Sequence, residues 1–414
     1  MAGETVGALA GIRVLDLSRV LAAPWATQML ADLGADVIKV ERPGVGDDAR
    51  IYGPAWLPDE NGKPTRESSF FLGANRNKRS IAVDFSKPAG REIIVDLARR
   101  CDVLMENFIA GAMARVGLDY ETIHAINPRL VYCSLTGYGQ SGPYSSRPGY
   151  DAVFQAQSGL MSVTGIPDDE PGGGPMRIGP SLVDITTGYN AAIGILAALL
   201  HRDRISGEGQ HIDIALLDTA VAMQSHMVQG YLVDGVVPER KGTVGNGGHP
   251  SKVFRCRDGT IYISAGNQKQ HEALCDVLGI PEVAKEPRFA TSPLRFDNRH
   301  EWDAIAEPRM MEWDKFDLQA ALVAARVPCS VINDYDVVFA DPHVRERGIE
   351  IEMAHPVTPT TRVRMVANPI RLSESPVRYD RPPPMIGQHT EEVLAELDGY
   401  DAARIASLRE QGVI

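Results

Sequence analysis

Residues 12–40 read IRVLDLSRVLAAPWATQMLADLGADVIKV, and this stretch decides the fold. The apolar runs 12–17 and 35–40 have the length and composition of buried strands, whereas 24–33 is typical of a helix with Pro24 near its first turn. Two strands joined through a helix pair in parallel. The stretch therefore predicts a βαβ unit, the building block of an α/β fold with a parallel sheet.

The same alternation of apolar runs and amphipathic segments continues along the chain. It predicts strands at 80–85, 103–107 and 130–135, and helices at 89–100, 111–116, 152–160 and 185–202. Residues 211–215 begin either a strand or a helix. After about residue 225 the character changes to a glycine-dense loop, followed by a strand at 260–264, helices at 269–278 and 315–326 and a strand at 328–332. This second pattern predicts a smaller α+β domain over 225–330.

Composition and charge narrow the classes of function. The formal net charge is −12, which disfavours nucleic acid and anionic membrane surfaces as partners. An anionic substrate would therefore have to be met by a local cluster of basic side chains. The five cysteines form no CxxC pair and the ten histidines no HxxxH pair, so we expect no metal site.

The segments that could target the chain predict a cytoplasmic location. Residues 1–10 lack the basic region and apolar run of a secretory signal. The longest strongly apolar stretch, 191–200, is too short to span a bilayer. An odd number of cysteines without paired spacing fits reduced thiols.

A βαβ start raises the alternative of an NAD-linked oxidoreductase. Glu41 ends the second strand, where a ribose-binding acid would lie. The turn after the first strand, 18–24, contains no glycine, however, and a dinucleotide fingerprint needs glycines there so that the backbone can approach a pyrophosphate. We therefore disfavour dinucleotide binding.

Short motifs along nearly the whole chain carry a resemblance to a known family. The motifs are Val14-Leu-Asp-Leu17, Ala23-Pro24, the run 33–44 with Gly46-Asp47, Asn77-Lys-Arg-Ser80 with Asp84, the run 102–108, Asn127-Pro-Arg129, the run 134–140 with Gly142-Pro143, Val183-Asp184 with Gly188, Gly207-Glu-Gly-Gln210 and Gly387-Gln-His389. In order and spacing they resemble the class III coenzyme A transferases. Each motif is weak alone, and their shared register is the evidence.

The resemblance implies a fold, an assembly and a reaction. The fold is a Rossmann-like large domain from both chain ends, here 1–220 and 335–414, with the smaller domain between them. Two ring-shaped subunits interlock into a homodimer. CoA moves between carboxylic acids through a covalent aspartyl intermediate at Asp184, with acyl-CoA and small acids as substrates and without a tightly bound cofactor or metal.

Asp184 has two alternative interpretations from the residues alone. It precedes an apolar helix, and an aspartate there is most often an N-cap. A helix N-terminus would also favour the ionised carboxylate, which is the nucleophilic form. The family motif around Asp184 favours the catalytic interpretation, and the two roles are compatible in part.

Further site residues are implied by the resemblance. The basic positions that face CoA are Arg42, Lys78, Arg79 and Arg115, and any one of them is otherwise a surface charge. Backbone or side chains that line the CoA pocket come from Val20, Leu21, Asn107 and Phe108, and Tyr138 and Gln140 lie near the reacting acyl group or form a structural turn. The glycine loop, with Gly245, Gly247 and Gly248, shields the intermediate from water or is an ordinary connection. We further expect Arg177 to hold the distal carboxylate of a dicarboxylic acid.

Other functions remain open at this point. The α-methylacyl-CoA racemases resemble this chain but carry a histidine where it has Tyr150, and a neutral tyrosine is a poor base near pH 7. A non-catalytic CoA-binding relative is a further alternative. The C-terminal half, with Pro382-Pro-Pro384, most resembles members that use succinyl-CoA as donor and a dicarboxylate such as glutarate as acceptor, and formate, oxalate or carnitine-type acids stay open.

Overall fold

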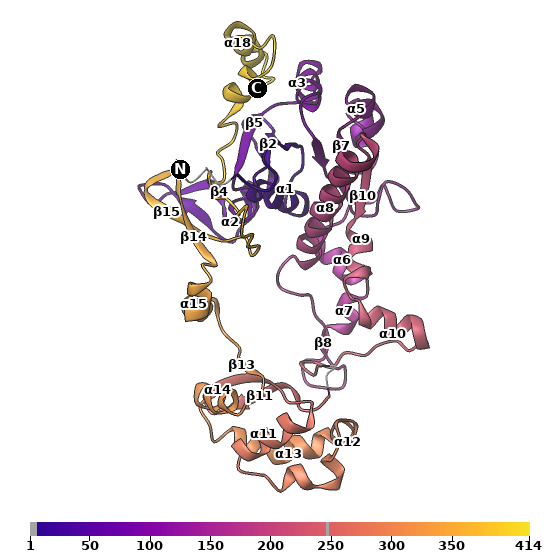
Figure 1. Cartoon of the computed structure of the whole chain (residues 1–414), viewed down its shortest axis with the longest axis vertical. Coiled ribbons are helices and arrows are strands. Elements are labelled where there is room, and N and C mark those ends of the chain that lie inside the picture. Colours follow the sequence, from indigo (N-terminus) through magenta and orange to yellow (C-terminus); the bar gives the residue numbers. More distant parts are fainter. Residues whose placement is uncertain (1–5, 246–247) are drawn as a thin grey trace. The chain divides into compact units, whose positions relative to one another are not determined.

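The computed structural model describes residues 6–245 and 248–414 (Figure 1). By its internal contacts the chain divides into two compact units. The larger comprises Met1–Leu160, Arg177–Val236 and Arg345–Ile414, and the smaller comprises Met161–Met176 and Val237–Val344. Both chain ends belong to the larger unit, which contains the sheet.

A six-stranded sheet forms the centre of the larger unit. Its strands are β1 (Arg13–Asp16), β2 (Asp36–Glu41), β5 (Lys78–Ala82), β6 (Val103–Glu106), β7 (Val131–Thr136) and β10 (His211–Ala215). They lie in the order β10-β7-β6-β1-β2-β5, and every neighbouring pair is parallel. Numbered within the sheet this is the order 3-2-1-4-5-6 of doubly wound folds, so the predicted parallel α/β fold is confirmed, and 211–215 is a strand.

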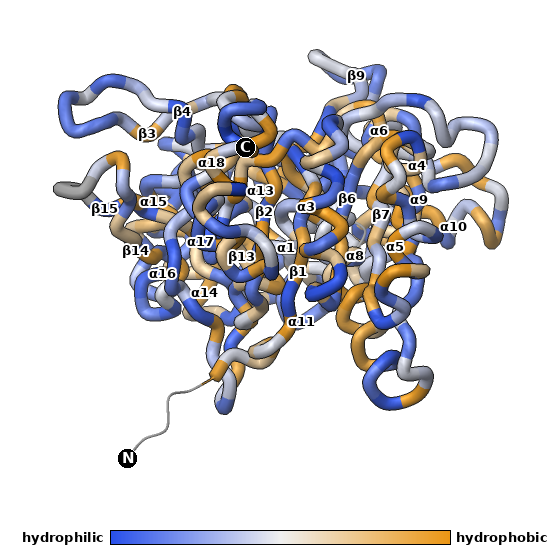
Figure 2. Tube along the Cα trace, turned by 90° about the horizontal axis from the view of Figure 1, so that it is seen from above, coloured by the Kyte–Doolittle hydropathy of each residue, from blue (hydrophilic) through white to orange (hydrophobic). Residues whose placement is uncertain are grey.

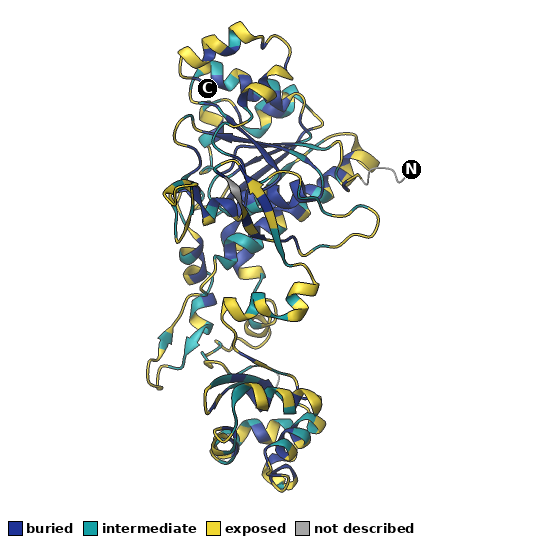
Figure 3. Ribbon diagram, turned by 90° about the vertical axis from the view of Figure 1, so that its left-hand side faces the viewer, coloured by how far each residue is buried: buried dark blue, intermediate teal, exposed yellow. Residues whose placement is uncertain are grey.

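Helices cover both faces of the sheet. One face packs against α1 (Ala22–Asp32), α6 (Asp151–Gln157), α8 (Leu182–His201) and α9 (Leu216–Ala222), and the other against α3 (Pro88–Ala98), α5 (Tyr120–Ile126), α17 (Thr390–Ala395) and α18 (Ala402–Glu410). Alternate strand residues enter the two cores: Val14 lies in one and Leu15 in the other. Most residues of β1, β2, β5, β6 and β7 are accordingly buried, drawn dark blue in Figure 3, whereas the edge strand β10 is only partly buried.

Gly188 permits a close contact between α8 and α1. A Cβ atom at this position of α8 would lie 2.5 Å from the carbonyl oxygen of Ala22 at the start of α1. A side chain there would force the two helices apart. Glycine therefore brings the first turn of α1 beside α8 one helical turn after Asp184, which positions both helix starts at the same edge of the sheet.

Shorter elements complete the larger unit. They are the 3-10 turn η1 (Asp48–Ile51), the hairpin β3 (Trp56–Pro58) and β4 (Pro64–Ser68), α2 (Ser69–Leu72), α4 (Ala112–Arg115), a π-helical turn (Arg202–Ser206), α10 (His226–Asp234), and the hairpin β14 (Glu350–His355) and β15 (Thr358–Val366). α16 (Pro342–Glu346) lies at the boundary between the units.

The smaller unit has a core of its own around Trp302 and Phe254. Its antiparallel sheet comprises β11 (Ser251–Cys256), β12 (Gly259–Ser264) and β13 (Cys329–Val331), in that order. The helices are α7 (Leu160–Val163), which begins at the unit boundary, α11 (Gln268–Val277), α12 (Ser292–Asp297), α13 (Arg299–Met310), α14 (Lys315–Ala324) and α15 (Tyr335–Ala340), with 3-10 turns at Val283–Lys285 and Pro287–Phe289.

The smaller unit, with Met161–Met176 and Val237–Val344, has other bounds than the predicted domain 225–330. Residues 161–176, expected in the large domain, belong to it through the hairpin β8 (Gly165–Ile166) and β9 (Gly174–Pro175). Arg240 holds this hairpin because its guanidinium donates to the carbonyl of Ile166 and pairs with Asp168. This anchor joins segments far apart in the sequence, which is why no local pattern revealed it.

α8 and the turn that follows it, Leu182–Ser206, form one helix that is long and apolar enough to cross a membrane. The estimate from residues 191–200 alone was therefore too short. The buried residues of α8, among them Ala191, Ile195 and Leu199, pack in the same core as α1 and the sheet. The hydrophobic stretch of α8, orange in Figure 2, is thus accounted for as a core helix of the larger unit.

Candidate active site

A pocket of about 260 Å³ lies where the carboxyl ends of β1, β6 and β7 meet. The strand order reverses between β1 and β6, and open α/β sheets bind ligands in the crevice at such a switch point. The lining residues all belong to the larger unit: Arg19, Val20, Leu21, Ala22, Asp48, Asn107, Phe108, Ile109, Leu135, Thr136, Gly137, Ser145, Arg147, Pro148, Gly149, Tyr150, Asp184 and Leu216.

Asp184 lines this pocket from the first turn of α8. The N-cap of that helix is Ser181, so the alternative interpretation of Asp184 as the cap was wrong. The cap position is filled from another helix: Asp151 Oδ2 accepts the backbone N–H groups of Val183 at 2.8 Å and of Asp184 at 3.1 Å. Gln155 Nε2 donates to Asp151 Oδ1 at 2.5 Å, which fixes the orientation of the capping carboxylate.

This arrangement reverses the expected electrostatics of Asp184. Burial and the negative charge of Asp151 raise the pKa of Asp184 to about 7. The helix start had been expected to stabilise the ionised form, but its N–H groups are occupied by Asp151. At neutral pH a substantial fraction of Asp184 is ionised, and loss of its proton makes the carboxylate nucleophilic in a largely dry site.

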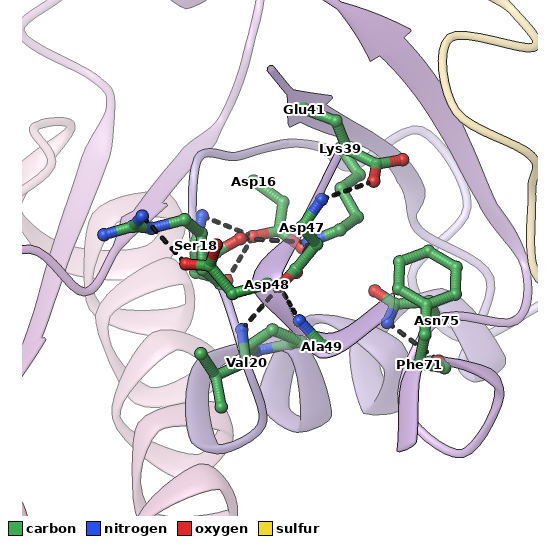
Figure 4. A network of polar contacts seen from close by, with 12 residues as sticks. Asp16, Ser18, Val20, Lys39, Glu41, Asp47, Asp48, Ala49, Phe71 and Asn75 are labelled. Carbon is green, nitrogen blue, oxygen red and sulfur yellow. Dashed lines mark hydrogen bonds and ion pairs between the residues drawn. The ribbon is translucent and has the colours of Figure 1, made fainter. Parts of the chain in front are cut away.

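The loop after β1 is held by side chains from three other segments, and Figure 4 shows two of these side chains, Lys39 and Asp47. Lys39 Nζ donates to the carbonyl of Ser18 at 2.9 Å, and Asp47 Oδ1 accepts the N–H of Val20 at 3.0 Å. Asn107 bonds both sides of Arg19, accepting its N–H at 2.9 Å and donating to its carbonyl at 2.7 Å. These hydrogen bonds fix the loop, which lacks the glycines of a dinucleotide-binding turn.

Val20 is strained in this loop. Its φ of 72° lies in the left-handed region, which a β-branched residue rarely occupies. Such a conformation costs roughly 1–3 kcal/mol and persists only where the surroundings fix it. The bonds from Asp47 and Asn107 on either side provide that constraint, so the pocket wall formed by Val20 and Leu21 is preorganised.

A buried network of ion pairs supports the loop after β1. Lys39 and Asp47 lie 2.8 Å apart with both side chains almost fully buried. Lys78 pairs with Asp16 at 3.1 Å, and its ammonium also donates to Asn75 Oδ1 and to the carbonyl of Pro24. Burial lowers the pKa of Lys78 to about 8. Lys78, predicted to face CoA, therefore has its donors directed into the protein.

Asp47→Ala is expected to destabilise the protein by about 3–5 kcal/mol, because Lys39 would be left buried without its partner. Urea denaturation followed by circular dichroism measures the effect. The matched control is Asp48→Ala at the neighbouring, partly exposed carboxylate, for which we expect a change within about 1 kcal/mol. Equal losses in the two variants would contradict a structural role of the buried pair.

The other predicted basic residues lie in different surroundings. Arg79 is buried and pairs with Asp36, Glu392 and Glu396, so it joins β5 to α17 instead of lining the pocket. Arg42 is half-exposed and pairs at 2.8 Å with Asp48, a pocket residue, which places it at the pocket margin. Arg115 is exposed at the end of α4 and does not line the pocket.

Of the remaining predicted residues, Tyr138, Gln140 and Arg177 do not line the pocket. Tyr138 packs behind the pocket, where its hydroxyl donates to Gln157, and Gln140 lines a neighbouring cavity of about 200 Å³ with Glu106 and His211. Arg177 is exposed and outside the pocket. In the smaller unit the N–H of Gly245 donates to the carbonyl of Ser251, and Gly248 has φ 92°, whereas Gly247 lies outside the described residues.

Three charged residues that the sequence analysis did not single out complete the site. Arg19 and Arg147 line the pocket, and Asp151 caps the helix that carries Asp184. The segment 148–151 was noted only for Tyr150, which also lines the pocket. The four-residue spacing of Asp151 and Gln155 on one helix face was a signal for a hydrogen-bonded carboxylate, but its target on α8 is distant in sequence.

The chemistry that this pocket supports is nucleophilic attack by a carboxylate. Of the two carboxylates that line it, Asp48 pairs with Arg19 and Arg42, whereas Asp184 has no ion pair within the part of the chain that the structure describes. Within the same part of the chain no three histidine, cysteine or acidic side chains converge as a metal site. Among the described residues, Asp184 is therefore the pocket carboxylate that no ion pair neutralises.

Comparison with known proteins agrees with this geometry. The family model for CoA-transferase family III matches residues 9–390. A succinate–glutarate CoA-transferase of Agrobacterium fabrum is 43% identical over 94% of this chain and 96% of its own length, and a human succinyl-CoA:glutarate CoA-transferase is 41% identical over 98% and 90%. The crystal structure of a CAIB/BAIF family protein from Brucella suis superposes with a TM-score of 0.85 at 41% identity, covering 95% of this chain and 100% of that one.

The family match covers more than nine-tenths of the chain, and the relatives align over nearly their whole lengths. The predicted resemblance is thereby confirmed. This chain belongs to CoA-transferase family III and is a CoA-transferase.

Proposed function

We propose that the enzyme moves CoA from succinyl-CoA to a dicarboxylic acid such as glutarate through an aspartyl-CoA thioester at Asp184. The observation that carries the mechanism is the position of Asp184, the carboxylate of the pocket without an arginine partner among the described residues. The names of the relatives from Agrobacterium fabrum and human support this choice of donor and acceptor.

The reaction proceeds in two symmetrical halves. The ionised Asp184 attacks the thioester carbonyl of succinyl-CoA, which forms a mixed anhydride and releases the CoA thiolate. The thiolate attacks the Asp184 carbonyl, so that aspartyl-CoA forms and succinate leaves. The acceptor carboxylate then attacks aspartyl-CoA, and the thiolate returns to the acceptor carbonyl of the second anhydride, which regenerates Asp184.

The walls of the pocket supply binding and orientation. The first turn of α1 has no side-chain cap, and its residues Leu21 and Ala22 line the pocket, so its N–H groups favour a negatively charged group there. Asn107, Phe108 and the fixed loop around Val20 form the remaining wall. Arg42, Arg115 and Arg19 attract the phosphates of CoA, which a chain with a formal net charge of −12 otherwise repels.

The anhydride and the thioester must be kept from water. We assign this task to the glycine loop with Gly245 and Gly248 in the smaller unit. Tyr138 and Gln140 stay candidates for orienting the acyl group through the Gly-Tyr-Gly-Gln loop. Acyl-CoA and small acids are the proposed ligands of a cytoplasmic enzyme, without a tightly bound cofactor or metal.

The function is tested with a panel of CoA thioesters and acids, with each product identified by mass spectrometry. We expect glutaryl-CoA to form from succinyl-CoA and glutarate at a higher kcat/KM than formyl-CoA or oxalyl-CoA from their respective acids. A protein that transferred CoA to oxalate, but not to glutarate, would contradict the proposed acceptor while leaving the family assignment intact.

The assembly that we propose is a homodimer. None of the residues of α10 is buried, although the helix carries large apolar side chains: Leu232 is 68% exposed and Val233 is 77% exposed. The apolar run continues beyond the helix with Val236 and Val237, which are 65% and 69% exposed. A contiguous exposed apolar segment of this kind is typical of an interface, and a second copy of the chain is the partner that the homodimeric, interlocked arrangement requires.

Leu232→Glu together with Val233→Glu is expected to convert the dimer to a monomer or to soluble aggregates, because two charges would be buried at the interface. Size-exclusion chromatography with light scattering measures the mass. Val323→Glu, at a residue of α14 that is 58% exposed, is the matched control and should leave the mass unchanged. A monomeric wild-type protein would refute the assembly directly.

A further inference from the structure

Two arginines line the pocket beside Asp184, and they differ in their partners. Arg19 pairs with Asp48 at 3.0 Å, and its guanidinium lies over the ring of Phe108. Arg147 forms no ion pair with any residue that the structure describes. Arg147 is exposed where it lines the pocket, and an arginine without a carboxylate there, in a protein with excess negative charge, is a ready partner for an anionic group of the substrate.

An aromatic ladder fixes the position of Arg147. Its guanidinium carbon lies 3.7 Å from the ring centroid of Tyr144. That ring packs edge-on against Tyr138, which in turn packs against the fully buried Phe154 of α6. A guanidinium stacked on a ring keeps the N–H groups at its edge free for a bidentate contact. The charge is therefore held in place while its donors remain unused.

The same helix connects Arg147 to the nucleophile. α6 begins at Asp151, four residues after Arg147, and Asp151 binds the backbone of Asp184. The base of the aromatic ladder, Phe154, lies on this helix as well. α6 thus binds the first turn of α8 through Asp151 and supports the aromatic residues under Arg147 through Phe154. Arg19 and Arg42, by contrast, follow β1 and β2 and share Asp48, so they form a separate cationic group suited to CoA.

We infer that Arg147 binds the second carboxylate of a dicarboxylic acid whose first carboxyl group reacts at Asp184. Arg147 thereby selects dicarboxylates over acids with a methyl group in place of the distal carboxylate. The inference rests on the proposed function and replaces the earlier expectation for Arg177, which is exposed and outside the pocket. The phosphates of CoA are the other anionic groups that Arg147 could bind, and the experiment below distinguishes them from the distal carboxylate.

The test compares glutarate with valerate, which has the same chain length but a single carboxylate. Because the reaction proceeds in two halves, kcat/KM for the acceptor does not depend on the donor, and product CoA thioesters are quantified by mass spectrometry. For Arg147→Gln we expect kcat/KM for glutarate to fall about 10- to 100-fold, the effect of a lost hydrogen bond to a charged group. The value for valerate should stay within about twofold, in line with a pocket contact that valerate lacks.

Neighbouring substitutions sharpen the test. Tyr144→Phe keeps the ring and should leave discrimination unchanged, whereas Tyr144→Leu removes the platform and should weaken it in the same direction as Arg147→Gln. Arg99→Gln, at an exposed arginine of the large unit outside the pocket, is the matched control without an effect. Arg147→Lys, which keeps the charge but loses the planar fork, should restore only part of the loss.

Three results would overturn the inference. First, kcat/KM could fall equally for glutarate and valerate while KM rises for butyryl-CoA, a donor without a distal carboxylate; Arg147 would then bind the CoA phosphates. Second, kcat/KM could stay unchanged for both acids; Arg147 would then have no role in ligand binding. A larger loss for valerate would also contradict it. If the wild-type enzyme transferred CoA to no dicarboxylate at all, the proposed function would fail instead, so the two failures are distinguishable.

Discussion

Asp184→Asn is expected to lower CoA transfer by about a thousandfold or more, because an amide cannot form the anhydride and no other pocket carboxylate is free. The substitution is nearly isosteric and retains an oxygen and the helix backbone. Steady-state assays with succinyl-CoA and glutarate measure the loss. Residual activity within tenfold of wild type would contradict a nucleophilic role of Asp184.

The same variant should be more stable than wild type at neutral and alkaline pH. Burial first, and then Asp151, raise the pKa of Asp184 from 3.8 to about 7, so the folded state retains a proton that the unfolded chain has released. Wild-type stability therefore falls as pH rises from about 4 to about 7. The full shift corresponds to about 4 kcal/mol, and solvent screening of this half-buried group reduces the expected gain to about 1–3 kcal/mol.

Urea denaturation of both proteins at pH 4.5 and pH 8 measures this linkage. The difference in unfolding free energy should be only about a quarter of its full value at the lower pH and reach about 1–3 kcal/mol in favour of Asp184→Asn at the higher one. A pH-independent difference would show that the carboxylate carries no raised pKa. A substitution that raises stability while it removes activity is typical of an active-site residue whose charged form is unfavourable in the folded protein.

Asp151→Asn should shift the pH dependence of catalysis to lower pH. The asparagine oxygen still accepts the N–H groups of Val183 and Asp184, but the negative charge that raises the pKa of Asp184 is removed. In the wild type, kcat/KM for succinyl-CoA should rise with pH and level off above about 7, since the ionised carboxylate is required. In the variant this rise should occur about one pH unit lower.

Profiles between pH 5 and pH 9 test this expectation. Asp48→Asn is the control, because it removes a pocket charge that is not a cause of the raised pKa, and its profile should keep the wild-type midpoint. Identical profiles for the wild type and Asp151→Asn would rule out Asp151 as the group that tunes Asp184. A midpoint that moved to higher pH would contradict the sign of the interaction.

The fold was predictable because its signal is local. Most sheet strands are apolar runs bounded by a helix or a turn, and the parallel pairing follows from the βαβ alternation that begins in residues 12–40. The order of the strands and the membership of 161–176 in the smaller unit depend instead on contacts between distant segments, such as Arg240 with Ile166. No periodicity within a window of ten to twenty residues contains that information.

The site was predictable in part for the same reason. The family motifs identified Asp184, Asn107 and the loop at Val20, all of which line the pocket. The motifs could not say which way a basic side chain points: Lys78 and Arg79 lie on β5, an edge strand whose residues are nevertheless mostly buried, so their charges are paired inside the protein. Arg147 lies in an irregular loop, and its role depends on the ring of Tyr144.

The prediction that Asp184 is ionised by its helix failed because the cap comes from elsewhere. A sequence pattern places Asp184 near the start of an apolar helix, but it does not reveal that Asp151, more than thirty residues earlier, occupies the same N–H groups. The sign of the pKa shift was reversed by that one tertiary contact together with burial. Local rules for helix ends hold only where no other charge competes for them.

The covalent aspartyl-CoA thioester that we propose at Asp184 can be tested by chemical trapping. The protein is incubated with succinyl-CoA without an acceptor, quenched with hydroxylamine or reduced with borohydride, digested and mapped by mass spectrometry. We expect a hydroxamate or an alcohol at Asp184 in the wild type, and none in Asp184→Asn. Transfer of CoA that proceeds at the full rate with an unmodified Asp184 would contradict it.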